Sequence, residues 1–118
     1  MLLRIDPESE TPLFAQIADS VRADAAAGRL RPGERLPAAR EIASALGVNV
    51  HTVLHAYQDL RDAGLVELRR GRGAVVTSQA GVLEELRNDI QHLAARARAA
   101  GIPPDALAAL VKEIARDR

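Results

Sequence analysis

Apolar residues recur at helical spacing in the first third of the chain. They stand four positions apart, at Leu13, Ile17, Val21 and Ala25. This spacing places them on one buried face of an amphipathic helix. Thr11 suits the N-cap of that helix, Pro12 its first position, and Gly28 the residue after its last turn. We therefore predict a helix between Thr11 and Gly28, preceded by an extended arm over residues 1–10.

Two shorter helical patterns follow in the middle of the chain. The first begins near Pro37, ends at Leu46 and is closed by Gly47. The second begins after Asn49, a favourable N-cap, and ends before Gly64. Its apolar positions form one stripe along the helix, at Val53, Ala56, Tyr57 and Leu60. A helix, a tight turn and a second helix in this order are the signature of a helix-turn-helix.

The period of the pattern changes after Gly64. Residues 65–69 and 74–77 form two short runs that favour strands, with a glycine-containing turn between them. Such a pair is typical of a β-hairpin. A hairpin directly after a helix-turn-helix makes a winged helix-turn-helix, and we predict this domain for residues 11–79.

Residues 80–118 are predicted to form a tail of two further helices. A hinge is expected over residues 78–81, followed by helices over about 82–100 and 105–116. Two amphipathic helices of this length leave apolar faces uncovered, which favours packing against a second copy of the chain; the alternative is that the tail folds back on the winged helix. The residues expected at the dimer interface are Leu86, Ile90, Leu93, Leu107, Leu110 and Ile114. The predicted fold class is mainly α with a small β-hairpin.

The composition narrows the classes of function. The chain has 118 residues, no cysteine, and only Phe14 and Tyr57 as aromatic residues. The absence of cysteine excludes a disulfide scaffold, a zinc site with thiolate ligands and a cysteine nucleophile. So few aromatic residues disfavour a protein that stacks the bases of single-stranded RNA. Because no apolar run is long enough for a membrane span or a signal peptide, we expect a soluble, cytoplasmic protein without membrane contact.

The 16 basic and 16 acidic residues give a net charge of zero. The net charge therefore indicates no binding partner, and local clusters of charge are more informative. Fifteen of the basic residues are arginine, which contacts phosphate and guanine through two parallel hydrogen bonds; GC-rich coding is the alternative explanation. Three arginines fall at the predicted hairpin turn beside two glycines, and two flank the start of the second helix. These are Arg69, Arg70, Arg72, Arg35 and Arg40.

The third predicted helix has a polar face opposite its apolar stripe. In helix-turn-helix proteins this helix enters the major groove by its N-terminal end, where polar side chains reach base edges and phosphates. The alternative is that these polar residues only face solvent. We expect DNA contacts from this helix end, the arginines and the turn glycines: Arg35, Arg40, Asn49, His51, Thr52, His55, Arg69, Arg70, Gly71, Arg72 and Gly73.

Signals for catalysis are missing from the sequence. No Ser-His-Asp order, paired buried acids or phosphate-binding loop appears, and Gly71-Arg72-Gly73 is too short for a dinucleotide fingerprint. His51 and His55 stand four positions apart, a spacing that suits a shared metal ion, but no third ligand completes the set. We predict no catalytic residue, no cofactor and no metal site.

The ordered motifs together resemble the GntR family of bacterial transcription regulators. The resemblance covers about residues 11–77 and is carried by residues 12–17, 28–37, 40–43, 46–49, Thr52-Val53, Ala56-Tyr57, Leu60, 64–66 and 70–73. The short tail is similar to that of the YtrA-like branch, whose tails pair two subunits, and residues 80–118 are too few for the effector domains of larger branches. The resemblance implies DNA contacts from Arg40, the third helix and the wing, and regulation of transporter genes.

The sequence thus predicts a dimeric repressor that binds double-stranded DNA at an inverted repeat. Its half-sites should lie about one helical turn, roughly 34 Å, apart or a multiple of that distance. The alternative is a winged-helix protein-interaction module without DNA binding, which the zero net charge permits. No polar cluster in the tail marks a ligand pocket, so the sequence defines no small-molecule effector.

Overall fold

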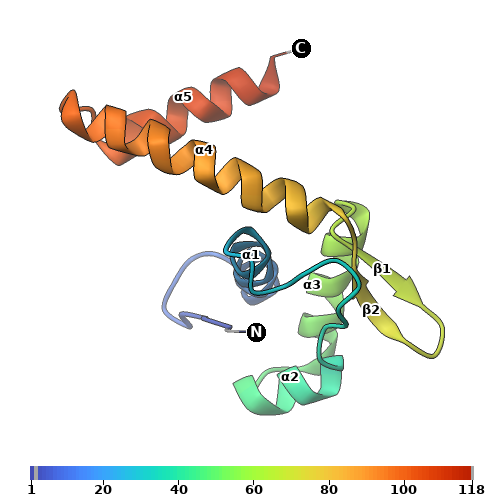
Figure 1. Cartoon of the computed structure of the whole chain (residues 1–118). Helices are drawn as coiled ribbons and strands as arrows, with labels where there is room; N and C mark the ends of the chain where they lie inside the picture. The colour runs from blue at the N-terminus through green and yellow to red at the C-terminus, as the bar shows by residue number, and fades with distance from the viewer. Residues whose placement is uncertain (2, 118) are drawn as a thin grey trace. The chain divides into compact units, whose positions relative to one another are not determined.

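The computed structural model describes Met1 and residues 3–117 (Figure 1). Over these residues the chain forms helices α1 to α5 and the strands β1 and β2. In chain order they are α1 Leu13–Ala26, α2 Ala39–Leu46, α3 Val50–Asp62, β1 Val66–Arg69, β2 Gly73–Val76, α4 Gln79–Ala99 and α5 Pro104–Arg116. The prediction of a mainly helical fold with one small hairpin is confirmed. No helix of the described part is long and apolar enough to cross a membrane.

The chain divides into two compact units, one from Met1 to Glu85 and one beginning at Leu86. The first unit therefore includes the first turns of α4, six residues beyond the expected start of the tail. The assignment of residues 80–118 as a dimerisation tail stays a prediction.

The core of the first unit forms where α3 packs against both α1 and α2. The predicted apolar stripes supply it, since Ile17, Val21, Val53 and Leu60 have no exposed surface. Burying a side chain of this size contributes roughly 1.5–3 kcal/mol. The wing adds residues from its base to the same core, namely Leu65, Val66, Ala74 and Val76. The core thus joins α3 and the base of the wing within the first unit.

Helix α1 begins one residue later than predicted, at Leu13 instead of Pro12. Pro12, with ψ at 146°, is extended and stands at the N-cap, where its carbonyl accepts a hydrogen bond from the Gln16 N–H at 3.1 Å. Thr11 makes no cap hydrogen bond; its carbonyl instead accepts from the Gln16 side chain at 2.7 Å. The predicted cap at Thr11 is therefore wrong, because the helical backbone begins only after the proline.

The N-terminal arm is held along α1 by two side chains of that helix. The Gln16 amide accepts from the Asp6 N–H at 2.6 Å and donates to the Asp6 carbonyl at 3.0 Å. One turn further along, the Ser20 hydroxyl accepts from the Arg4 N–H and donates to the Arg4 carbonyl. Two apolar side chains of the arm pack against the core, Leu3 and Ile5. The arm thus belongs to the first unit.

The turn between α2 and α3 follows the prediction closely. Gly47 adopts the left-handed conformation with φ at 69°, which ends α2. The Asn49 side-chain oxygen accepts a hydrogen bond from the His51 N–H at 2.8 Å and caps α3. The two helices of the helix-turn-helix are therefore set by residues whose local chemistry is visible in the sequence.

The wing is an antiparallel hairpin in which Val66 pairs with Val76 and Arg69 with Gly73. The connector before α2 lies along the other edge of β2. Leu36 N–H donates to the Ala74 carbonyl, and Arg35 forms a bridge with Val75. Strand β2 thus has partners on both sides, and the connector carries Arg35 to the base of the wing.

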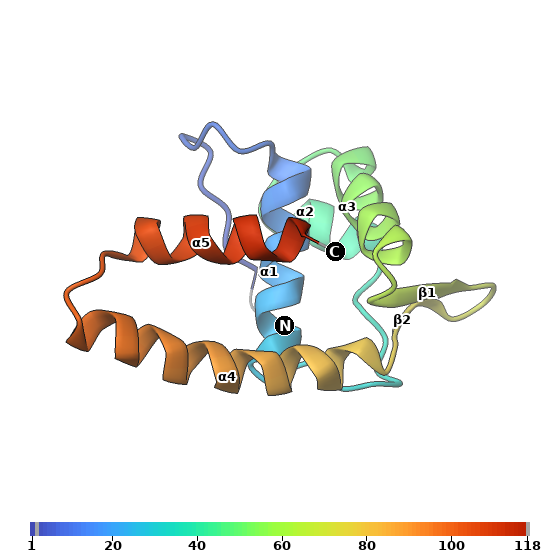
Figure 2. The ribbon, with the colours of Figure 1, turned by 90° about the horizontal axis from the view of Figure 1, so that it is seen from above.

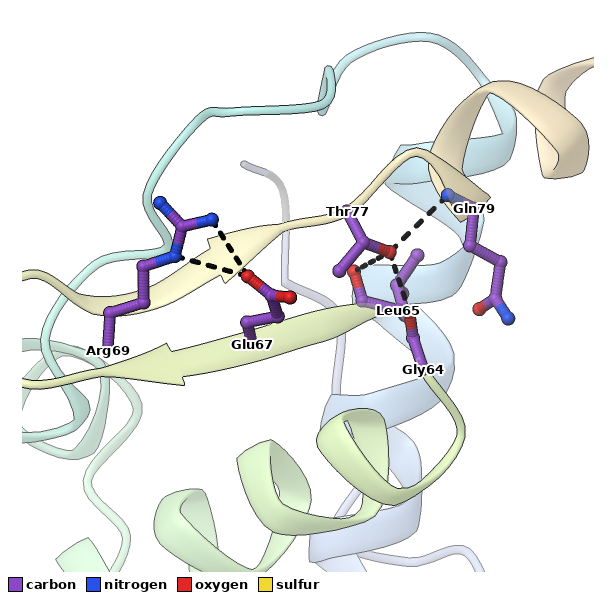
Figure 3. A network of polar contacts seen from close by, with 6 residues as sticks. All are labelled: Gly64, Leu65, Glu67, Arg69, Thr77 and Gln79. Carbon is purple, nitrogen blue, oxygen red and sulfur yellow. Dashed lines mark hydrogen bonds and ion pairs between the residues drawn. The ribbon is translucent and has the colours of Figure 1, made fainter.

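Residues 79–81 of the segment predicted as a hinge, 78–81, are helical instead, because α4 already begins at Gln79. Figure 3 shows the reason: the Thr77 hydroxyl oxygen accepts from the Gln79 N–H at 3.3 Å and lies 2.6 Å from the Gly64 carbonyl oxygen. The Gln79 side chain donates to the Ala63 carbonyl, and Ala80 is buried. The end of α3 and the start of α4 are thus tied together.

The second unit consists of the rest of α4 and α5. The chain reverses over residues 100–103, so α5 runs opposite to α4 (Figure 2). Gly101, with φ at 76°, and a hydrogen bond from the Ile102 N–H to the Ala97 carbonyl form this turn. Among residues 86–117, Ala97 alone is buried. This unit therefore has almost no core of its own.

Candidate nucleic-acid interface

The N-terminal end of α3 presents a polar surface. His51 is exposed and Thr52 is half-buried, while the next residue, Val53, is buried in the core. Asn49 uses one lone pair of its side-chain oxygen for the helix cap, so its amide N–H groups and the second lone pair remain for another partner. This end of the helix therefore offers hydrogen-bond donors without any carboxylate.

His55 is held by two neighbours. Its ring stacks on Phe14 of α1, with the ring centroids 3.7 Å apart and the planes 14° from parallel. Its Nε2 atom lies 3.7 Å from an Asp59 carboxylate oxygen. The imidazole remains half exposed on the α1 side of α3. These two contacts constrain the orientation of the His55 ring. A contact between His55 and DNA stays a prediction.

Four exposed arginines surround α3 from three other segments. Arg35 lies on the connector, Arg40 in the first turn of α2, and Arg70 and Arg72 in the turn of the wing. Within residues 1 and 3–117, none of these four guanidinium groups has a hydrogen bond or ion pair with another residue. Their charges are therefore available to an anionic partner.

Arg69, the third arginine of the wing, is placed differently. Its guanidinium group donates to one Glu67 carboxylate oxygen at 2.8 and 3.1 Å (Figure 3). Since side chains alternate along a strand and Leu68 lines the hollow described below, Arg69 and Glu67 lie on the other face of β1. An exposed ion pair contributes only about 0–1 kcal/mol, so a phosphate can compete for Arg69.

The turn of the wing requires its glycines. Gly71 and Gly73 have φ angles of 80° and 73°, which side-chain-bearing residues rarely adopt. No atom lies within 4 Å of a Cβ built on either residue. The glycines are thus needed for the backbone conformation, and the space around the turn stays open for a ligand.

A hollow of about 700 Å³ lies between α3, the start of α2 and the wing. Arg35 and Arg72 line it together with two half-exposed leucines, Leu54 and Leu68. The predicted site residues did not include these leucines. A signal existed for Leu54, because it is an apolar residue on α3 outside the buried stripe.

Tyr57 anchors the inner wall of this hollow. Its hydroxyl donates to the Pro37 carbonyl at 2.6 Å, which fixes the connector against α3. Burial, and to a lesser extent the negative charge of Glu41, raises the pKa of Tyr57 to about 12. The hydroxyl is therefore neutral and able to donate at physiological pH.

The second unit carries a large apolar surface. The six residues predicted for a dimer interface all lie in this unit, and five of them are 39–62% exposed, with Leu107 half-buried. Ile90, Leu93 and Leu107 line one groove of about 770 Å³ between α4 and α5, together with Ile102 and Val111. The other three predicted residues, Leu86, Leu110 and Ile114, lie outside this groove.

The helix-turn-helix, the wing and the surrounding arginines define a winged-helix domain of the kind that reads DNA. Residues 13–76 match the family described as bacterial regulatory proteins, gntR family. The chain is 32% identical to the HTH-type transcriptional repressor YtrA of Bacillus subtilis, over 98% of this chain and 94% of that protein.

Two solved structures have the same fold. YtrA from Sulfolobus acidocaldarius, a GntR-family transcription factor, is 42% identical with a TM-score of 0.62, covering 84% of this chain and 99% of that one. The DNA-binding domain of AraR in complex with operator ORE1 is 26% identical with a TM-score of 0.56, covering 65% of this chain and 94% of that one.

The chain belongs to the gntR family of bacterial regulatory proteins, in its YtrA-like branch. It is a DNA-binding regulator of transcription and not an enzyme. This assignment decides between the two functions that the sequence left open, in favour of DNA binding over a protein-interaction module.

Proposed function

We propose that this protein is a dimeric repressor that binds an inverted-repeat operator. The observation that carries the proposal is the group of four exposed, unpaired arginines on the connector, the start of α2 and the turn of the wing, two of which line the hollow beside α3. The complex of the AraR domain with its operator supports it, because that domain has the same fold. The proposed DNA contacts are those predicted from the sequence.

The proposed contacts divide by chemistry. Arg35, Arg40, Arg70 and Arg72 are assigned to phosphates, because their guanidinium groups are exposed and unpaired. Asn49, His51 and Thr52 are assigned to base edges, because they stand at the end of α3 that enters the major groove in this class of domain. Each phosphate contact adds about 0.9 to the slope of log affinity against log salt concentration.

The lack of a core in the second unit supports dimerisation through it. No residue of α5 is buried within the chain, and two helices with exposed apolar faces are marginally stable alone in water. A second copy is the proposed occupant of this surface, since a two-fold contact covers the same apolar face on both chains. Two winged-helix domains related by this two-fold symmetry, one from each subunit, read an inverted repeat.

The test is a DNA-binding isotherm of the full chain at two salt concentrations. One duplex carries the region upstream of its own gene, and the other carries a scrambled sequence. We expect tighter binding to the native region and a steep loss of affinity in salt. Equal affinity for both duplexes would contradict an operator-specific repressor.

Paired variants assign the binding surface. R70A/R72A should weaken binding and reduce the salt slope by about 4, because the two substitutions remove two phosphate contacts from each of the two subunits and each contact adds about 0.9. R22A/R61A removes the same charge from residues paired with Asp19 and Asp62 and serves as the matched control. Equal losses in both variants would show a general charge effect and contradict the assigned surface.

The proposed regulated genes are transporter genes, an expectation that rests on the family resemblance alone. Transcript levels in a strain that lacks this gene would test it. Increased transporter transcripts are the expected result for a repressor. An unchanged level for every transporter gene would contradict this part of the proposal.

A further inference from the structure

Helix α3 carries an exposed leucine on the side that faces the wing. Leu54 is 40% exposed, although Val53 beside it is fully buried. Gln58, one turn further along, lines the same hollow. A single exposed leucine is common on protein surfaces, so its surroundings decide whether it has a role.

The surroundings of Leu54 are suited to a DNA strand. Arg35 and Arg72 line the hollow with it, and neither guanidinium group has a partner among the described residues. Two cations of this kind bind backbone phosphates. Leu54 follows His51 by three positions, so both lie on neighbouring parts of the same helix surface. A strand held by the arginines therefore brings base edges close to Leu54.

Only one base offers an apolar group in the major groove. Thymine presents its 5-methyl group there beside the O4 acceptor, whereas the polar groups of the other bases are not accompanied by a methyl group. A leucine satisfies no donor or acceptor, and covering one without a partner is unfavourable. Contact with a methyl group, by contrast, removes apolar surface of both partners from water.

We propose that Leu54 reads the 5-methyl group of a thymine in each operator half-site. The inference rests on the proposed function and adds a specificity-determining residue to it. Leu68 lines the same hollow from β1, but it lies on the wing and not on the helix that enters the major groove. It is therefore assigned no base contact.

The experiment removes the methyl group from the DNA and the leucine from the protein. In the footprinted operator, each thymine is replaced in turn by deoxyuridine, at the same position of both half-sites. Dissociation constants are measured for the full-length wild-type protein, L54A and L68A. Far-UV circular dichroism checks that each variant is folded, which we expect because both leucines are exposed.

The expected result is one position per half-site at which loss of the methyl groups weakens wild-type binding about 15-fold, about fourfold for the one methylene-sized group lost in each of the two half-sites. L54A should be weaker on the thymine operator and indifferent to deoxyuridine at that position. L68A should keep the wild-type sensitivity. Equal sensitivity of L54A and the wild type at that position would overturn the proposal.

Two other outcomes separate the inference from the proposed function. A wild-type protein that prefers its operator but is indifferent to every deoxyuridine overturns the role of Leu54 and leaves the repressor intact. Weaker binding of L54A under those conditions would mean that the leucine touches the deoxyribose backbone. A wild-type protein without any operator preference overturns both.

Discussion

Tyr57 is a single residue that links the core to the proposed DNA-binding surface. Its ring is buried against the core, and its hydroxyl holds the connector through the Pro37 carbonyl. Burial disfavours the charged phenolate, and the nearby Glu41 carboxylate disfavours it further, so the pKa is raised to about 12. The position of the connector therefore depends on a neutral tyrosine.

A pH titration tests this. The folded pKa lies above the unfolded value of about 10, so the stabilisation is complete below pH 10 and is lost as the pH rises from 10 to 12. The loss should be about 1.4 kcal/mol per pH unit. Tyr57 is the only tyrosine and there is no tryptophan, so absorbance at 295 nm follows this group alone. We expect a midpoint near 12 in the native protein and near 10 in urea.

Tyr57→Phe supplies the control for that titration. The variant has no phenol, so its free energy of unfolding should fall less steeply over the same pH range. It should also lose about 1 kcal/mol at neutral pH, because the Pro37 carbonyl loses its donor. A native midpoint near 10 would contradict the buried, hydrogen-bonded hydroxyl.

At the residue scale, burial was predicted correctly where apolar residues recur at helical spacing. The stripe of Val53, Ala56, Tyr57 and Leu60 follows from helical spacing, and all four are buried. The bond from Tyr57 to a carbonyl twenty positions earlier and the stack of His55 on Phe14 have no such period. They depend on how elements pack, which spacing within one element does not specify.

Prediction at the scale of elements failed mainly at helix starts. The order of helices and strands was predicted correctly, but the starts of α1 and α4 were not. Each start depends on a side chain or backbone angle just before the helix. Thr77 is the clearest case, because one hydroxyl contacts the end of α3, the base of the wing and the start of α4.

Thr77→Val tests how much the Thr77 hydroxyl contributes to the free energy of unfolding. The substitution keeps the shape of the side chain and leaves the Gln79 N–H without its cap, so we expect a loss of about 1–2 kcal/mol. Urea unfolding at a fixed protein concentration measures it. Ser78→Ala, at the exposed neighbouring position, should change stability by less than about 0.5 kcal/mol. Equal effects of the two substitutions would show that the Thr77 contacts contribute little.

At the scale of the whole molecule, the sequence predicted features within one chain but could not establish contacts between two chains. The motifs predicted the winged helix-turn-helix and the family correctly. The compact units divide after Glu85, because the contacts of Thr77 and Gln79 include the start of α4 in the first unit. An interface between two copies has no internal contact that could show it, and the proposed dimer rests on uncovered apolar surface.

L93D/L110D tests the dimer. A carboxylate on this apolar surface opposes association, so we expect a monomer in sedimentation equilibrium. The variant should retain the helical content of the winged helix and bind a single half-site like the wild type. Its affinity for the full operator should fall about a hundredfold or more. In the dimer, binding of one winged-helix domain holds the second domain at a high effective concentration near its half-site, and the monomer loses this effect.

The matched control for this variant is Val82→Asp. Val82 is also an exposed apolar residue of α4, but it lies in the first unit and outside the predicted interface. V82D should therefore remain dimeric. Persistence of the dimer in L93D/L110D would contradict the assigned interface.

The exposed edge of strand β1 bears on whether the protein aggregates. Strand β2 is covered on both sides, by β1 and by the connector, whereas β1 pairs with β2 alone in the described structure. An open strand edge is a template onto which a strand of another molecule can add. β1 is only four residues long and carries the charged pair Glu67 and Arg69, two features that discourage such addition. The wing can therefore stay uncovered between encounters with DNA without joining the wings of other molecules into a continuous sheet.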